Sequence, residues 1–95
     1  MTSSLSALAL LERTHVFPCS YLFKIIGKAD NGFVARVVAT VREELLSDFD
    51  PPFRVREAVG GRHLAVTIEP VVQSARQVVA IYRRLGGIDG VVMLL

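Results

Sequence analysis

The apolar positions in the first half of the chain change from a period of two to a period near four. Aromatic and branched residues dominate residues 19–26, and Gly27 closes this run. Such a run predicts a strand, on which successive side chains point to opposite faces of a sheet. One face would carry Tyr21, Phe23 and Ile25, and the other would carry Leu22, Lys24 and Ile26.

The next element is predicted to be a helix that begins in the turn at residues 27–33. Apolar residues then recur at every fourth position, as on the buried stripe of an amphipathic helix: Phe33, Val37, Val41 and Leu45. Asp30 is the expected N-cap, because its carboxylate can accept the unpaired N–H groups of the first turn. Asp50 precedes two prolines, which end any helix that remains there.

The second half of the chain begins with two alternating runs that predict a β-hairpin. Residues 53–59 and 63–69 alternate, and Gly60 and Gly61 form the turn between them. Pro70 has no N–H group and should limit strand pairing at the far end of the second run.

A second helix and a final strand follow the hairpin. Ser74 and Gln77 have the spacing of a capping box, in which each side chain bonds the backbone of the other residue. The helix should end at Gly86, and residues 91–95 predict a short strand.

The resulting order is β-α-β-β-α-β, which predicts an α+β fold of the ferredoxin-like type. Right-handed crossovers place four strands in one antiparallel sheet with two helices on one face. The first and third strands should lie in the middle of the sheet and the second and fourth at its edges. This domain should span residues 16–95, after an N-terminal extension at residues 1–15 that is either a short helix or disordered.

Composition agrees with one globular domain and excludes several classes of protein. The chain has 95 residues, of which 52% are hydrophobic and 21% are charged, with a formal net charge of +2. No apolar run reaches the roughly 18–20 residues of a membrane-spanning helix. The apolar patch within residues 4–13 has no basic residue before it and ends in Glu12 and Arg13, which argues against a signal peptide. We therefore expect the protein in the cytoplasm, without membrane partners.

The sequence offers few groups for catalysis or metal binding. Cys19 is the one cysteine, and His15 lies four residues before it. A Cys–His pair is conceivable there, but a free cysteine more often behaves as a small buried hydrophobe. A zinc site needs about four ligands, and His15, Cys19 and His63 show no such spacing. We expect no catalytic residues, no metal, no cofactor, and no enzyme activity.

The predicted sheet leaves one face uncovered by helices, and this face is a candidate interaction surface. Its candidate residues are Leu22, Lys24, Ile26, Arg54, Arg56, Ala65 and Thr67. RNA-recognition modules of this fold stack bases on aromatic side chains of the central strands. No aromatic residue occupies those positions here, so nucleic acid is an unlikely ligand. Arg54 and Arg56 are expected to keep the edge soluble and to pair with acids such as Glu69.

Four segments resemble the YbeD-like family of small bacterial proteins. They are F-P-C-S-Y-L-F-K-I-I-G (17–27), H-L-A-V-T-I-E (63–69), Q-V-V-A-I-Y-R-R-L (77–85) and G-V-V-M-L-L (90–95). The chain departs from the family at Ser20, where an acid is usual, and at Pro70. The resemblance implies a fold similar to the ACT regulatory domain, and no established biochemical activity.

ACT domains bind amino acids where a glycine-containing turn meets the first helix, in a motif written Asp-x-x-Gly-x-Leu-Ala. Residues 30–35, D-N-G-F-V-A, look like a shifted version of that motif. The resemblance implies a candidate ligand site: Gly27, Asp30, Asn31, Gly32 and Phe33. The alternative is that these residues only begin the helix. Asp30 favours this alternative, because it puts negative charge where a carboxylate ligand would bind.

Two functions of different kinds follow from these residues. The first is a non-catalytic regulatory or adaptor domain that contacts a protein partner or a second copy of itself through the open sheet face or the sheet edges. The second is a sensor of an amino acid or small carboxylate at residues 27–33. RNA binding is a third and weaker alternative.

Overall fold

The computed structural model describes residues 4–95; residues 1–3 of the expected N-terminal extension lie outside the described part of the chain. The helices are α1 (Ser4–Thr14), α2 (Phe33–Leu45) and α3 (Ala75–Gly86). The strands are β1 (Cys19–Ser20), β2 (Phe23–Lys28), β3 (Phe53–Glu57), β4 (His63–Ile68), β5 (Val71–Val72) and β6 (Val91–Leu94). A short 3-10 turn, η1 (Val59–Gly61), joins β3 to β4.

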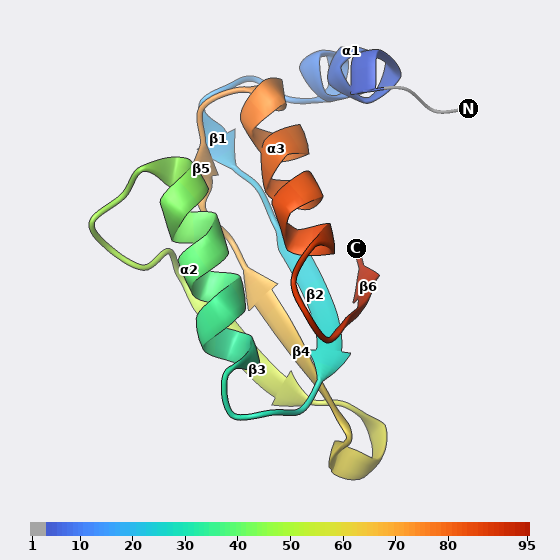
Figure 1. Ribbon diagram of the computed structural model, residues 1–95. Coiled ribbons are helices and arrows are strands. Elements are labelled where there is room, and N and C mark those ends of the chain that lie inside the picture. The colour runs from blue at the N-terminus through green and yellow to red at the C-terminus, as the bar shows by residue number, and fades with distance from the viewer. Residues whose placement is uncertain (1–3) are drawn as a thin grey trace.

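The main sheet has the predicted ferredoxin-like order. Its four strands run β3-β4-β2-β6, and each neighbouring pair is antiparallel. Helices α2 and α3 cover one face of this sheet (Figure 1). The predicted first and third strands, now β2 and β4, lie in the middle, and β3 and β6 form the edges. The sequence-based prediction of fold class and strand order is therefore confirmed.

The prediction of the first strand is wrong in one respect, because the segment forms two strands instead of one. β1 pairs with β5 in a separate two-stranded sheet, with Cys19 opposite Val72. β2 begins only at Phe23 and pairs with β4 from there. The physical reason lies in Pro70, which follows β4: it has no N–H to donate, so the strand pairing cannot continue unbroken. Its carbonyl oxygen instead accepts a hydrogen bond of 3.0 Å from the N–H of Tyr21.

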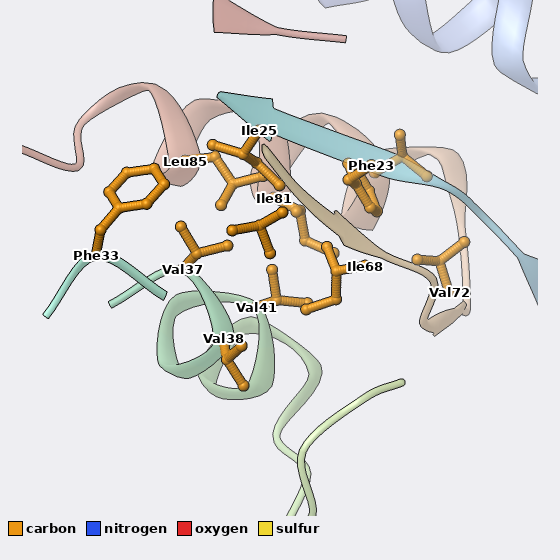
Figure 2. Packing of buried hydrophobic residues seen from close by; sticks show 12 residues of the cluster. Phe23, Ile25, Phe33, Val37, Val38, Val41, Ile68, Val72, Ile81 and Leu85 are labelled. Atoms are coloured by element: carbon orange, nitrogen blue, oxygen red, sulfur yellow. The ribbon is translucent and has the colours of Figure 1, made fainter. Parts of the chain in front are cut away.

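The core lies between the helices and the covered face of the sheet. The two predicted inward residues of β2, Phe23 and Ile25, are completely buried, and Ile68 of β4 is buried beside them. Figure 2 shows these side chains converging with those of α2 and α3. The buried residues contributed by the helices are Phe33, Val37, Val38, Val41, Val78, Ile81 and Leu85. The apolar stripe predicted from Phe33 onward is therefore the surface of α2 that faces the sheet.

The helix ends differ in detail from the predictions. The chain leaves α2 at Leu46, five residues before the first proline, in a left-handed conformation (φ 54°). At the start of α3, Ser74 caps the helix as predicted, since its Oγ accepts the N–H of Gln77 at 3.1 Å. The Gln77 side chain reaches one residue further back than in a capping box, and its Oε1 accepts the N–H of Gln73 at 2.8 Å.

Helix α1 lies outside the sheet and contacts α3. It begins at Ser4 and ends at Thr14, whose hydroxyl donates to the carbonyl of Leu10 at 2.9 Å. Within residues 4–95, no helix is long and apolar enough to cross a membrane.

Candidate functional site

The face of the main sheet opposite α2 and α3 gathers most of the residues expected there. Thr67 on β4 lies between Arg54 on β3 and Lys24 on β2 in the strand register. Two residues along each strand, Ala65 lies in the same way between Arg56 and Ile26. We call these six residues the open face: Lys24, Ile26, Arg54, Arg56, Ala65 and Thr67. Register between antiparallel strands makes them cross-strand neighbours, although they come from three separate segments.

The open face contains a shallow depression. It has a volume of about 190 Å³ and is lined by five open-face residues and by Val55: Lys24, Arg54, Val55, Arg56, Ala65 and Thr67. The structure therefore brings together five of the seven residues of the predicted interaction surface. Ile26 lies beside the depression on β2, whereas Leu22 lies in the gap between β1 and β2, beyond the first β2–β4 pair at Phe23.

The three cations of the open face are not neutralised within the described chain. Ion pairs in residues 4–95 join Arg36 to Asp30, Arg42 to Asp50, and Arg84 to Glu43 and Glu44. Lys24, Arg54 and Arg56 take part in none of these, so the expected pairing with Glu69 is wrong. Glu69 follows the end of β4, where its N–H donates to the carbonyl of Pro52 at 3.0 Å. The open face therefore keeps a positive charge that is available to a partner.

Apolar groups extend the open face toward β6. Met93 lies opposite Ile26 in the β2–β6 register and is half exposed. The uncovered side of the sheet thus combines three cationic side chains at β3 and β2 with an apolar strip at β2 and β6.

The turn at residues 27–33 is tightly packed around Phe33. The ring of Phe33 is fully buried and lies directly over Gly27, where an added Cβ would overlap its Cζ and Cε1 atoms. Of the five candidate ligand residues, Asn31 lines a groove between α2 and β3. Gly27 and Phe33 belong to the packed interior, so the turn has a structural role that the sequence did not reveal.

Asp30 binds the start of α2, although it is not the N-cap. The N-cap is Gly32, which makes no side-chain hydrogen bond, so the predicted cap is wrong by two residues. Asp30 Oδ1 accepts the N–H of Gly32 at 2.8 Å, and Oδ2 accepts from Nη2 of Arg36 at 2.9 Å. The hydrogen bond from Arg36, followed by that from Gly32, holds the pKa of Asp30 below its ordinary value. The negative end of this pair thus occupies the place where an anionic ligand would meet the helix.

Asp30 should make stability depend on pH in the acidic range. Its lowered folded-state pKa means that its contribution is present above the ordinary carboxyl pKa of 3.8 and is lost as the pH falls through the folded-state value. We expect Asp30→Asn to be less stable than the wild type at pH 7, and the difference to shrink as the pH falls below 3.8 toward the lowered folded-state pKa. Urea unfolding between pH 7 and pH 2.5 measures it, with Asp48→Asn as the control. A difference that stays constant with pH contradicts the assignment.

The conceivable Cys19–His15 pair does not form in the described structure. His15 packs against the rings of Phe17 and Tyr21, with centroids 5.9 and 5.2 Å away, and its Nδ1 lies 2.8 Å from the hydroxyl of Thr14. Cys19 is a free, half-buried thiol that packs against the core. Within the described residues, no group of three or more His, Cys, Asp or Glu side chains is placed to hold a metal ion.

Three residues of these regions were missed by the sequence analysis. Arg36 lies on the wet side of the predicted helix, and its partner Asp30 is six positions away, beyond the usual helical pair spacing. Val55 alternates with Arg54 and Arg56, yet it lines the depression and is left exposed by the edge position of β3. Met93 could have been found by pairing the last strand with the first, if the register had been known.

Comparison with known proteins identifies the family of this chain. Residues 12–95 match the family model described as "Protein of unknown function (DUF493)". The chain belongs to the DUF493 family. Among its DUF493/UPF0250 relatives is a UPF0250 protein of Shewanella amazonensis, 37% identical over 75 residues, which are 79% of this chain and 83% of the relative. A Vibrio cholerae UPF0250 protein is 33% identical over 79 residues, 83% of this chain and 84% of the relative.

Solved structures confirm the ACT-like fold expected from the YbeD-like resemblance. The solution structure of a Helicobacter pylori protein is similar to this DUF493 chain with a TM-score of 0.62 and 18% identity, covering 86% of each chain. The ACT domain of GTP pyrophosphokinase from Chlorobium tepidum gives a TM-score of 0.54 at 16% identity, covering 80% of this chain and 84% of that domain. At such identities the likeness concerns the fold alone.

Proposed function

We propose that this DUF493 chain is a non-catalytic regulatory or adaptor domain that binds another protein through its open face. One observation carries the proposal: Lys24, Arg54 and Arg56 lie together on a sheet face that no described helix covers, without an ion-pair partner in residues 4–95. Three unpaired cations beside exposed apolar groups are suited to a protein partner with complementary charge.

The chemistry of the depression supports binding rather than catalysis. Two of its side chains, Arg54 and Arg56, carry guanidinium groups, which donate hydrogen bonds and do not lose their protons in proteins. Such groups recognise carboxylates but cannot serve as general bases. We place this activity in the cytoplasm, since a chain with one cysteine has no internal disulfide to need an oxidising compartment.

Sensing of an amino acid or small carboxylate at residues 27–33 is the second candidate, favoured by the fold shared with an ACT domain. The geometry of the turn gives it less support. Asp30 already accepts the N–H of Gly32 and pairs with Arg36, so an anionic ligand would have to displace a carboxylate of the protein itself.

A photo-crosslinking amino acid at Met93 tests the adaptor proposal. Met93 lies beside Ile26 and is exposed, so this substitution reports on the open face without removing a cation. We expect discrete crosslinked products of higher mass in cells that produce the protein. The matched control carries the same amino acid at the exposed Arg76 on α3, on the other side of the molecule. Equal products from both positions, or none from position 93, would refute binding through the open face.

A further inference from the structure

The outer edge of β3 has backbone groups free to pair with another strand. Along the β3–β4 ladder, Glu69 N–H donates to Pro52 O at one end and Ala58 N–H donates to His63 O at the other. Hydrogen-bonded positions alternate in an antiparallel pair, so Arg54 and Arg56 turn their backbone groups toward β4. The N–H and C=O groups of residues 53, 55 and 57 therefore point outward, away from the sheet.

This edge is open to a partner along its whole length. β3 is the last strand of the sheet on its side, and all five of its residues are exposed. In Figure 1 the ribbon of β3 forms the border of the sheet below α2. An unprotected edge of this kind is a template for strand addition.

The side chains of β3 differ in character between the two faces of the sheet. Together they define which kind of strand would fit beside β3. On the open face, Arg54 and Arg56 line the same depression as Lys24, with no acid paired to them in the described structure. On the other face, Phe53 is half exposed and borders a groove of about 530 Å³ between β3 and α2, lined in part by Val34 and Val38. A strand added here would place alternate side chains against cations and against apolar surface.

We propose that the partner contributes an extended acidic segment that adds as a fifth strand to the edge of β3. Its carboxylates bind Arg54 and Arg56, which lie on the neighbouring strand of the open face. Its alternate apolar side chains pack on Phe53, Val55 and the groove beside α2. This inference rests on the proposed function and specifies the partner of the same site: a segment in which acidic and apolar residues alternate.

A second copy of the chain is a poor occupant for this edge. The outward residues 53, 55 and 57 of two antiparallel β3 strands would have to pair with one another. Any register that pairs two or more of these residues places Arg54 or Arg56 of one copy directly opposite Arg54 or Arg56 of the other. Like charges directly opposite each other on a sheet are destabilising, whereas an acidic strand forms opposite-charge pairs at the same positions.

A synthetic peptide tests the inference directly. The probe is fluorescein-labelled Thr-Glu-Val-Glu-Val-Glu-Thr, whose three glutamates share one face of a strand and whose two valines share the other. Binding to the full chain is followed by fluorescence anisotropy at low and high salt. Two further peptides serve as controls: one of the same composition with its glutamates grouped together, and one N-methylated at both valines, which removes the N–H groups that would face β3.

Variants of the chain separate charge from strand pairing. We expect Arg54→Glu/Arg56→Glu to weaken binding about ten-fold or more, since it replaces attraction by repulsion. Arg13→Glu/Arg76→Glu makes the same change in net charge on α1 and α3 and should leave binding nearly unchanged. Val55→Pro removes an outward N–H without breaking a β3–β4 hydrogen bond and should also weaken binding about ten-fold. The N-methylated peptide tests the same contact on the wild-type chain, where folding is not in question.

The outcomes distinguish this inference from the proposed function. Equal binding of the alternating, grouped and N-methylated peptides would overturn strand addition, as would equal loss in the two double variants. Tighter binding of an oligouridylate than of the peptide would overturn it in favour of nucleic acid, and a β3-dependent dimer would overturn it in favour of a second copy. If the peptide fails while crosslinks form at position 93, the adaptor function stands and the acidic strand does not.

Discussion

Replacement of Gly27 by alanine is expected to destabilise the fold by about 3 kcal/mol, at the upper end of the usual cost of overpacking a core. A Cβ at this position would overlap the ring of Phe33 and would lie 2.9 Å from the carbonyl oxygen of Gly90. Phe33 is completely buried and cannot move aside cheaply, and the Gly90 contact is with backbone. Because folded domains are stable by only about 5–15 kcal/mol, this change alone should lower the unfolding midpoint markedly.

Urea unfolding of Gly27→Ala, Phe33→Leu and the double variant measures this contact. Leucine removes the far ring atoms of Phe33, so the double variant should lose less stability than the sum of the two single changes. Gly86→Ala is the matched control, because an added Cβ there meets only the Leu94 side chain at an ordinary 3.8 Å. Additive effects in the cycle would mean that the ring of Phe33 does not limit residue 27.

The Gly27–Phe33 contact bears on the function of the turn. A ligand that approached the backbone at Gly27 would have to displace a ring that the core holds in place. The glycine therefore has a packing role that explains it without any ligand. The start of α2 similarly explains Asp30, through its bonds to Gly32 and Arg36.

The sequence predicted the fold well because local and tertiary preferences agree along most of the chain. Alternation at residues 53–59 and 63–69 fixed the hairpin, and the period of the buried stripe fixed α2. The break between β1 and β2 was not predictable from residues 19–26 alone. It depends on Pro70, which lies far away in sequence and meets Tyr21 only after the chain folds back.

The candidate interaction surface was predictable only in part, from the alternation of residues along the strands and the order of the strands in the sheet. Alternation assigns Lys24, Thr67 and Arg54 to one face of the sheet, and the strand order then makes them neighbours. The absence of an ion pair with Glu69 in the described residues was not predictable, because it depends on the path of the chain where β4 ends. The same holds for Val55, whose exposure follows from the edge position of β3 rather than from its own pattern.

Replacement of Phe23 by alanine should have an effect at least as large, of about 3–5 kcal/mol, because it empties a large volume in the core. Phe23 is fully buried on central strand β2, and its ring centroid lies 4.9 Å from that of Tyr21 and 4.8 Å from that of Tyr82. The loss of these ring contacts adds to the loss of apolar burial. Urea unfolding measures the change, and Phe49→Ala is the control, since Phe49 is 80% exposed and should matter little.

The pKa of Tyr82 provides a second measurement of the cavity that Phe23→Ala would create. It reports the entry of water at this place in the core, which an overall loss of stability does not. Burial, followed by its neighbour Tyr21, holds the pKa of Tyr82 above its ordinary value, and its hydroxyl donates to the carbonyl of Leu95 at 3.2 Å. Removing the Phe23 ring admits water beside Tyr82, so its pKa should fall toward the ordinary tyrosine value of about 10. Phenolate absorbance in a Tyr21→Phe background isolates Tyr82 under conditions where the variant remains folded. An unchanged titration, together with a stability loss no greater than that of Phe49→Ala, would contradict the placement of Phe23 between the two tyrosines.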